Sequence, residues 1–175
     1  MQFQIGDRVV HPVYGLGTVK TFTEQQFGGT KMRQYYEITT RGPTVWVPID
    51  ERGRTVLRGI ASKASLAKCR DLLQGSPIPF DNRRQVRQLE IGGRMKGGLL
   101  PAMCEMVRDL RARSWGIALG VTEEELLRRL SKLLCDEWAA ADGISPASAL
   151  HEIEDLLQKG SVSWIPNAGA RRHIG

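Results

Sequence analysis

The hydrophobic pattern of this chain changes its period near Arg58, and that change limits the folds open to it. Before Arg58, apolar and polar residues alternate in the short runs DRVVHP, GTVKTF, QYYEITT and TVWVPID, each bounded by turn residues. Alternation of this kind predicts β-strands. After Arg58, apolar residues recur every three or four positions, which predicts amphipathic helices. The chain therefore divides into a β part and an α part.

The β part is short for its number of predicted strands. Four or five strands in so few residues cannot make two stacked sheets, so a small curled barrel is expected. In IGDRVVHPVYGLGTVK, Gly15 and Gly17 supply the backbone angles of a sharp corner, and Pro12 stands where a strand ends. We expect the interior to be filled by Val10, Val13, Leu16 and Val19.

Four or five helices of ordinary length are predicted after the strands, enough for a small bundle. The segment SKASLAKCRDLLQG places Leu66, Cys69 and Leu73 on one stripe and closes at Gly75, and the prolines of SPIPFD prevent its continuation. A basic segment, NRRQVRQLE, follows and is expected to be broken by GGRMKGG.

The remaining helices are predicted from apolar spacing and from start and stop signals. One runs from Leu99 to about Trp115, where apolar residues recur at helical spacing, namely Leu100, Met103, Val107 and Leu110. The next begins at a capping box formed by Thr122 and Glu125, and the last begins at a Ser-Pro pair and stops at Gly160. The predicted fold is α+β in two domains: a Tudor- or SH3-like β-barrel over residues 1–58 and an all-α helical bundle over 59–160. A flexible tail is expected over 161–175.

Charge is distributed unevenly along the chain, whose net charge is +6. Residues 59–115 carry eleven Lys or Arg against five Asp or Glu, whereas residues 116–160 carry four against nine. Five cations lie close together, at Arg83, Arg84, Arg87, Arg94 and Lys96, and the first three share a face if the segment is helical. Such a cluster favours a polyanionic partner, although a merely solvated basic surface is the common alternative.

Signals for catalysis or for a membrane are weak. The cysteines Cys69, Cys104 and Cys135 are odd in number and widely spaced, which suits reduced thiols, and no His/Cys spacing resembles a metal site. No apolar run is long enough to cross a bilayer, and the N-terminal residues do not resemble an export signal. We therefore expect a cytoplasmic, non-catalytic protein without a cofactor, metal or small-molecule substrate.

Three motifs together resemble a known family. IGDRVVHPVYGLGTV, then YYEI followed by VWVPID, and RDLLQGSPIP at the end of the first helix are similar to the CarD/CdnL-type bacterial transcription regulators. The first domain of that family is shared with the RNA-polymerase-interacting domain of the transcription-repair coupling factor. The resemblance covers residues 1 to about 80 and continues more weakly through EMVRDL and LLRRLSKLL.

The resemblance implies two macromolecular partners. In the family, the barrel docks on the β subunit of bacterial RNA polymerase, largely through an edge strand, at places that correspond here to Gln25 and Trp46. Trp46 is flanked by Val45 and Val47, and alternation would turn it to the opposite face from these valines. We expect the three residues of this strand and Gln25 to form the polymerase-binding surface, although Trp46 could instead cover the end of the barrel.

On the DNA side, the resemblance implies contact with promoter DNA at the upstream edge of the transcription bubble, which stabilises the open complex. Family members carry a wedge tryptophan at the place of Asn82, where this chain has none. Phe80 could serve as a weaker wedge, or pack against the bundle. The arginines that follow in the family match Arg83 and Arg84, with Arg87 one turn on.

Two other functions are also compatible with the sequence. The chain could be a divergent paralogue that binds polymerase without wedging into DNA. It could also be a stand-alone nucleic-acid-binding module of the Tudor or KOW kind. Against the second, residues 1–58 carry only eight Lys or Arg against five Asp or Glu, and their aromatic residues do not interleave with basic ones.

Overall fold

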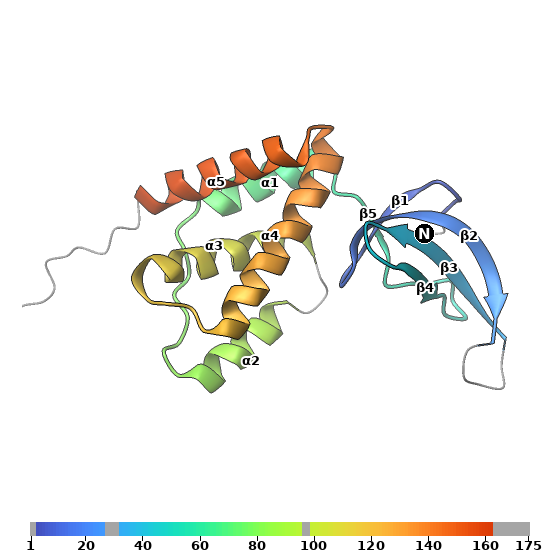
Figure 1. Cartoon of the computed structure of the whole chain (residues 1–175), viewed down its shortest axis with the longest axis horizontal. Coiled ribbons are helices and arrows are strands. Elements are labelled where there is room, and N and C mark those ends of the chain that lie inside the picture. Colours follow the sequence, from blue (N-terminus) through green and yellow to red (C-terminus); the bar gives the residue numbers. More distant parts are fainter. Residues whose placement is uncertain (1–2, 27–31, 96–98, 163–175) are drawn as a thin grey trace, which may run out of the picture.

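The computed structural model describes residues 3–26, 32–95 and 99–162, and it consists of a sheet followed by helices (Figure 1). Within these residues the strands are β1 (Arg8–His11), β2 (Gly15–Gln25), β3 (Arg33–Thr40), β4 (Thr44–Pro48) and β5 (Arg58–Gly59). The helices are α1 (Lys63–Gln74), α2 (Arg84–Arg94), α3 (Leu100–Gly116), α4 (Val121–Asp142) and α5 (Pro146–Val162). The two-part α+β layout predicted from the change of period is confirmed.

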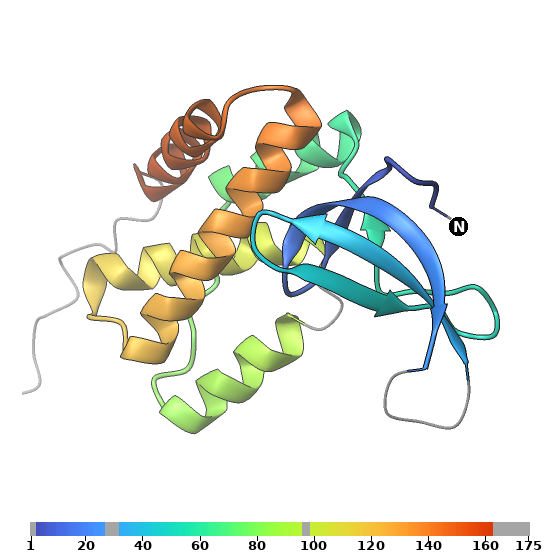
Figure 2. The ribbon, with the colours of Figure 1, turned by 45° about the vertical axis from the view of Figure 1, so that its right-hand side comes forward.

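The strands form one antiparallel sheet in the order β4-β3-β2-β1-β5. The long strand β2 is irregular between Val19 and Thr21 and curves strongly over the sheet (Figure 2). Among the described residues β4 and β5 do not pair with each other, so the sheet is open where a closed barrel was expected. β4 is therefore an edge strand, and no helix runs alongside it in either view.

The concave face of the sheet has its own apolar core. Its buried residues are Val9, Val19, Tyr36, Ile38, Val47 and Leu57. Of the four residues predicted to fill the interior, Val19 is confirmed. Val10 is buried on the other face, beside Met103 and Leu133 of the helices, and Val13 is 58% exposed. Successive residues of a strand face opposite sides, and because helices cover the second side, both valines of β1 are buried.

The helical part has a separate core, to which α1 contributes as predicted. Leu66, Cys69 and Leu73 are fully buried, and the helix ends at Gly75. Helices α3, α4 and α5 pack around α1, and Trp138 lies at the centre with no exposed surface. The cysteines of the chain are all buried and free, which agrees with the expected reduced thiols.

One predicted helix start is shifted by a neighbouring side chain, and one predicted helix break is found where expected. Helix α4 begins before Thr122, since the N–H of Gly120 donates to the Glu123 carboxylate at 3.4 Å. The predicted box of Thr122 and Glu125 is therefore wrong by two positions. Helix α2 ends at Arg94, inside the segment GGRMKGG that was predicted to break it, and residues 96–98 of that segment lie outside the described residues.

Gly160 does not stop α5, which continues to Val162. A Cβ at Gly160 would lie 3.0 Å from the carbonyl oxygen of Gln74. This glycine therefore permits close approach between α5 and the end of α1. The predicted tail begins within the helix, and its residues 163–175 lie outside the described residues.

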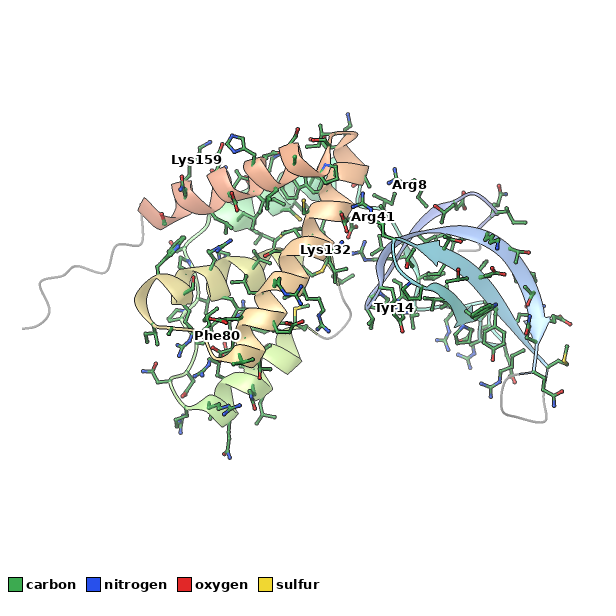
Figure 3. All side chains as sticks on the ribbon, viewed as in Figure 1. Arg8, Tyr14, Arg41, Phe80, Lys132 and Lys159 are labelled. Atoms are coloured by element: carbon green, nitrogen blue, oxygen red, sulfur yellow. The ribbon has the colours of Figure 1, made fainter. Side chains whose placement is uncertain are left out.

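Ion pairs whose carboxylates are buried join the sheet to α4. Arg58 of β5 donates two hydrogen bonds to the Glu137 carboxylate at 2.5 and 2.7 Å, and the N–H of Ala61 donates a third at 3.1 Å. Arg41, in the turn between β3 and β4, binds Asp136 at 2.5 Å (Figure 3). Because Glu137 is only 1% exposed, the sheet is held against the bundle at a fixed place.

Candidate macromolecule-binding surfaces

The edge strand β4 presents one large aromatic side chain outward. Trp46 is 44% exposed, whereas Val47 is buried in the sheet core and Val45 packs against that core. The predicted alternation of Trp46 against its two valines is confirmed. Trp46 can contact a partner directly, while the valines hold the strand in place from behind. Val47 is closed to any partner's side chain.

Gln25 lies on the same face of the sheet as Trp46 but not beside it. The register sets Trp46 opposite Glu37 and Gln25 opposite Arg33. Since Glu37 and Arg33 are four positions apart on β3, all four side chains point to one side. Gln25 is exposed at the end of β2. The structure thus places both predicted residues on the convex face, two strands apart.

An open groove lies beyond the end of β4, and strand periodicity does not predict it. It has a volume of about 1150 Å³ and is lined by residues of the β3 start and of the segment 48–56. Met32 and Val56 line it with 60% and 59% of their surfaces exposed. Neither residue belongs to a clear alternating run, so strand periodicity does not mark them.

The predicted basic cluster divides into outward and inward arginines. Arg83 immediately precedes α2 and binds the Asp81 carboxylate through Nη2 at 2.8 Å and through its own N–H at 2.7 Å. Hydrogen bonds from Arg83 lower the pKa of Asp81 from 3.8 to about 2. The Arg83 side chain is nevertheless 77% exposed. Arg84 and Asn82 are exposed, and no carboxylate among the described residues pairs with Arg84.

Arg87 points into the bundle. It is 7% exposed, its Nε donates to Glu123 at 2.5 Å, and its Nη1 donates to the carbonyls of Asp81 and Asn82 at 2.9 and 3.0 Å. The expectation that Arg87 shares an outward face with the preceding arginines is therefore not met. Helical spacing fixes relative directions, but Glu123 of α4 decides which direction faces inward.

Arg94 and Phe80 are also committed to internal contacts. Arg94 binds the buried carboxylate of Asp109, and its guanidinium lies 5.4 Å from the centre of the Phe80 ring. Phe80 is 7% exposed and belongs to the helical core. The structure supports the packing interpretation of Phe80, not the wedge. Lys96, the last member of the predicted cluster, lies outside the described residues.

Other kinds of site have little support in the part of the chain that the structure describes. No group of three or more His, Cys, Asp or Glu side chains there could hold a metal ion. Glu123, Glu124 and Glu125 lie in the first turns of α4, where acidic residues favour the positive helix end. A search of the same residues finds no helix long and apolar enough to span a bilayer.

Comparison with known proteins identifies the sheet region. Residues 3–61 match the family model of the CarD-like/TRCF RID domain. The sheet region thus resembles a CarD-like domain. The CarD-like match includes every described strand and ends just before α1. The resemblance drawn from the opening motifs is thereby confirmed.

A second comparison reaches beyond the CarD-like domain. The chain is 27% identical over 149 residues to a protein of Bacillus subtilis (strain 168) named "Putative transcription factor YdeB". The match covers 82% of this chain and 94% of that protein. Because the aligned length is far greater than the CarD-like domain, the similarity extends into the helical part.

Proposed function

We propose that this protein is a non-catalytic, cytoplasmic transcription regulator with two binding surfaces. The CarD-like unit, residues 1–58, binds the β subunit of bacterial RNA polymerase. The helical unit, residues 59–160, contacts promoter DNA near the upstream edge of the transcription bubble and modulates open-complex stability. The observation that carries the proposal is the CarD-like match over a sheet whose edge strand carries an exposed Trp46.

The polymerase contact is assigned to the convex face of the sheet, with Trp46 as its centre and Gln25 toward its rim. An exposed aromatic residue on an edge strand favours association, because it buries a large apolar area when a partner binds. Capture of RNA polymerase by the immobilised full chain tests this assignment. Trp46→Ala is expected to reduce capture at least tenfold. Ile5→Ala, which removes another exposed apolar side chain of the same unit, is the control.

The DNA contact is assigned to the outward arginines Arg83 and Arg84, since Arg87 and Arg94 are occupied inside the bundle. Arg84→Glu should weaken binding to an upstream-fork DNA and lower the salt dependence by about one phosphate contact. Lys159→Glu is the matched control, because Lys159 lies on α5, across the bundle from α2 (Figures 1 and 3). Equal losses in the two variants would remove the assignment.

A polymerase-binding paralogue that does not wedge into DNA is the second candidate. It is favoured by the burial of Phe80 and by the internal pairing of two of the predicted DNA-binding arginines. The fork titration separates the candidates, because DNA affinity unchanged by Arg84→Glu would favour the paralogue. A stand-alone Tudor- or KOW-like module would instead show no capture of polymerase.

A further inference from the structure

Helix α2 has an unusual orientation on the bundle. Its one buried side chain is Arg87, while Leu89 is 79% and Val86 38% exposed. A surface helix normally turns its apolar side inward and its charged side outward. Among the described residues of α2, Ile91 is the apolar side chain that packs, partly buried, against the helical core. Apolar burial is therefore a minor part of what holds this helix.

Two arginine–carboxylate contacts hold α2, and we call them the arginine clasp: Arg87 with Glu123, and Arg94 with Asp109. The two arginines are seven positions apart, about two turns, and so lie on one side of the helix. Their partners come from different helices, α4 and α3. Both ends of α2 are thus fixed to the bundle by charge-assisted hydrogen bonds, which are stronger than neutral ones.

The carboxylates of the clasp are themselves fixed. Asp109 is 1% exposed and accepts hydrogen bonds from Arg108 Nε at 2.7 Å and from the N–H of Ile78 at 3.0 Å. Glu123 accepts from the N–H of Gly120 and lies 3.8 Å from Arg113 Nε. Because Asp109 is held by a backbone and a side-chain donor and Glu123 by a backbone donor, these carboxylates define where the α2 arginines must sit.

The Glu123 half of the clasp also fixes the segment that precedes α2. While Arg87 Nε is bound to Glu123, its Nη1 bonds to the carbonyls of Asp81 and Asn82. Arg83 follows these carbonyls directly and Arg84 is the first residue of the helix. A single guanidinium thus connects α4 to the loop that carries the outward arginines.

We infer that Glu123 is a positioning residue for DNA binding: it holds Arg87, which in turn aims Arg83 and Arg84 at the phosphates. The clasp itself follows from the contacts above, and its consequence for DNA rests on the proposed function. Coulomb's law alone predicts the opposite effect, since removal of an acidic side chain near a basic surface should strengthen DNA binding. The sign of the change therefore separates positioning from simple electrostatics.

Three variants of the full chain make the test. Glu123→Gln removes the charge that holds Arg87, and Glu123→Asp keeps the charge but shortens the reach by one methylene. Glu124→Gln is the control, because Glu124 is exposed beside Glu123 and the charge change is the same. Each variant is measured by amide hydrogen exchange of residues 83–94 and by affinity for an upstream-fork DNA at fixed salt. Exchange in α1 reports whether the bundle stays folded.

We expect Glu123→Gln to raise exchange in residues 83–94 by about tenfold or more, with α1 unchanged, because a buried charge has lost its partner. Its DNA affinity should fall severalfold, whereas Glu124→Gln should bind DNA equally or slightly more tightly. Glu123→Asp should change the hydrogen exchange and the DNA affinity in the same directions as Glu123→Gln, but by less. If Glu123→Gln does not fold, Glu123→Asp provides the test of the positioning role.

Unchanged exchange in both Glu123 variants would overturn the clasp. Raised exchange together with DNA affinity equal to that of Glu124→Gln would overturn the positioning role while leaving the DNA-binding function intact. A wild-type chain that does not bind the fork DNA would instead remove the proposed function, and the exchange measurements would then decide the clasp alone.

Discussion

Helices α1 and α2 are nearly equal in length, with 12 and 11 residues, but they attach to the same bundle by different physics. Helix α1 buries Leu66, Cys69 and Leu73 completely. Helix α2 buries Arg87 and leaves Leu89 in solvent. The first attachment is non-directional and scales with buried apolar area, whereas the second depends on the geometry of a few hydrogen bonds.

The difference shows where periodicity is informative. A stripe of apolar residues states which side of α1 is buried. In α2 the same spacing rule relates its arginines to each other but does not say which side faces inward, since Glu123 and Asp109 come from distant parts of the chain. Which side of α2 faces inward decides which arginines are exposed, and the function proposed for the basic segment depends on those exposed arginines.

The largest expected effect comes from truncation of the apolar attachment. Leu73→Ala should lower the free energy of unfolding by about 2–5 kcal/mol, because it removes a fully buried side chain and leaves a cavity. Leu89→Ala in α2 should change it by less than about 0.5 kcal/mol. Urea denaturation of both variants measures the pair. Similar losses in the two would contradict the comparison.

The ionic attachment of α2 should differ from the apolar attachment of α1. Stability lost by removing one member of an ion pair can be recovered by removing the other member as well. Arg87→Met leaves Glu123 buried without its main partner and should cost about 1–3 kcal/mol. Arg87→Met combined with Glu123→Leu should recover most of that loss, since apolar replacements of buried ion pairs are often neutral. A double-mutant cycle from urea denaturation checks this. Additive losses would show that the two side chains do not act as a pair.

Replacing a glycine by alanine should change the stability of the fold in opposite directions at the contact of α5 with α1 and in α2. Gly160→Ala places a methyl group against Gln74 at the end of α1 and should destabilise the fold by about 1 kcal/mol. Gly92→Ala in α2 meets no atom within 4 Å and should stabilise it by about 0.5–1 kcal/mol, because alanine favours helix. Thermal unfolding of both variants provides the measurement. A stabilising Gly160→Ala would mean that the helices can move apart.

The smallest effect is local to the start of α2. Hydrogen bonds from Arg83 lower the pKa of Asp81 to about 2, so the contact is complete above the ordinary carboxyl pKa of 3.8 and is lost as pH falls through about 2. Arg83→Gln should return the pKa toward 3.8. An NMR titration of the Asp81 carboxyl carbon measures both. A wild-type pKa near 3.8 would show that Arg83 does not donate hydrogen bonds to the Asp81 carboxylate.

How much the sequence could predict varied with the kind of interaction involved. Alternation located β1 to β4 and the outward side of Trp46, and helical stripes located α1 and the core side of α3. The two-residue strand β5 is too short for any period to be recognised. The face of Val10 could not be predicted, because both sides of β1 are covered. Periodicity also could not decide between burial and exposure of Phe80, because its burial depends on helices that follow it in the chain.

A crossed binding experiment tests the central claim that one surface holds polymerase and another holds DNA. The full chain, Trp46→Ala and Arg84→Glu are each measured against purified RNA polymerase and, separately, against upstream-fork DNA at one salt concentration. The account predicts that Trp46→Ala loses polymerase affinity and keeps DNA affinity, and that Arg84→Glu does the reverse. Loss of the same partner in both variants, or of neither partner in either, would contradict it.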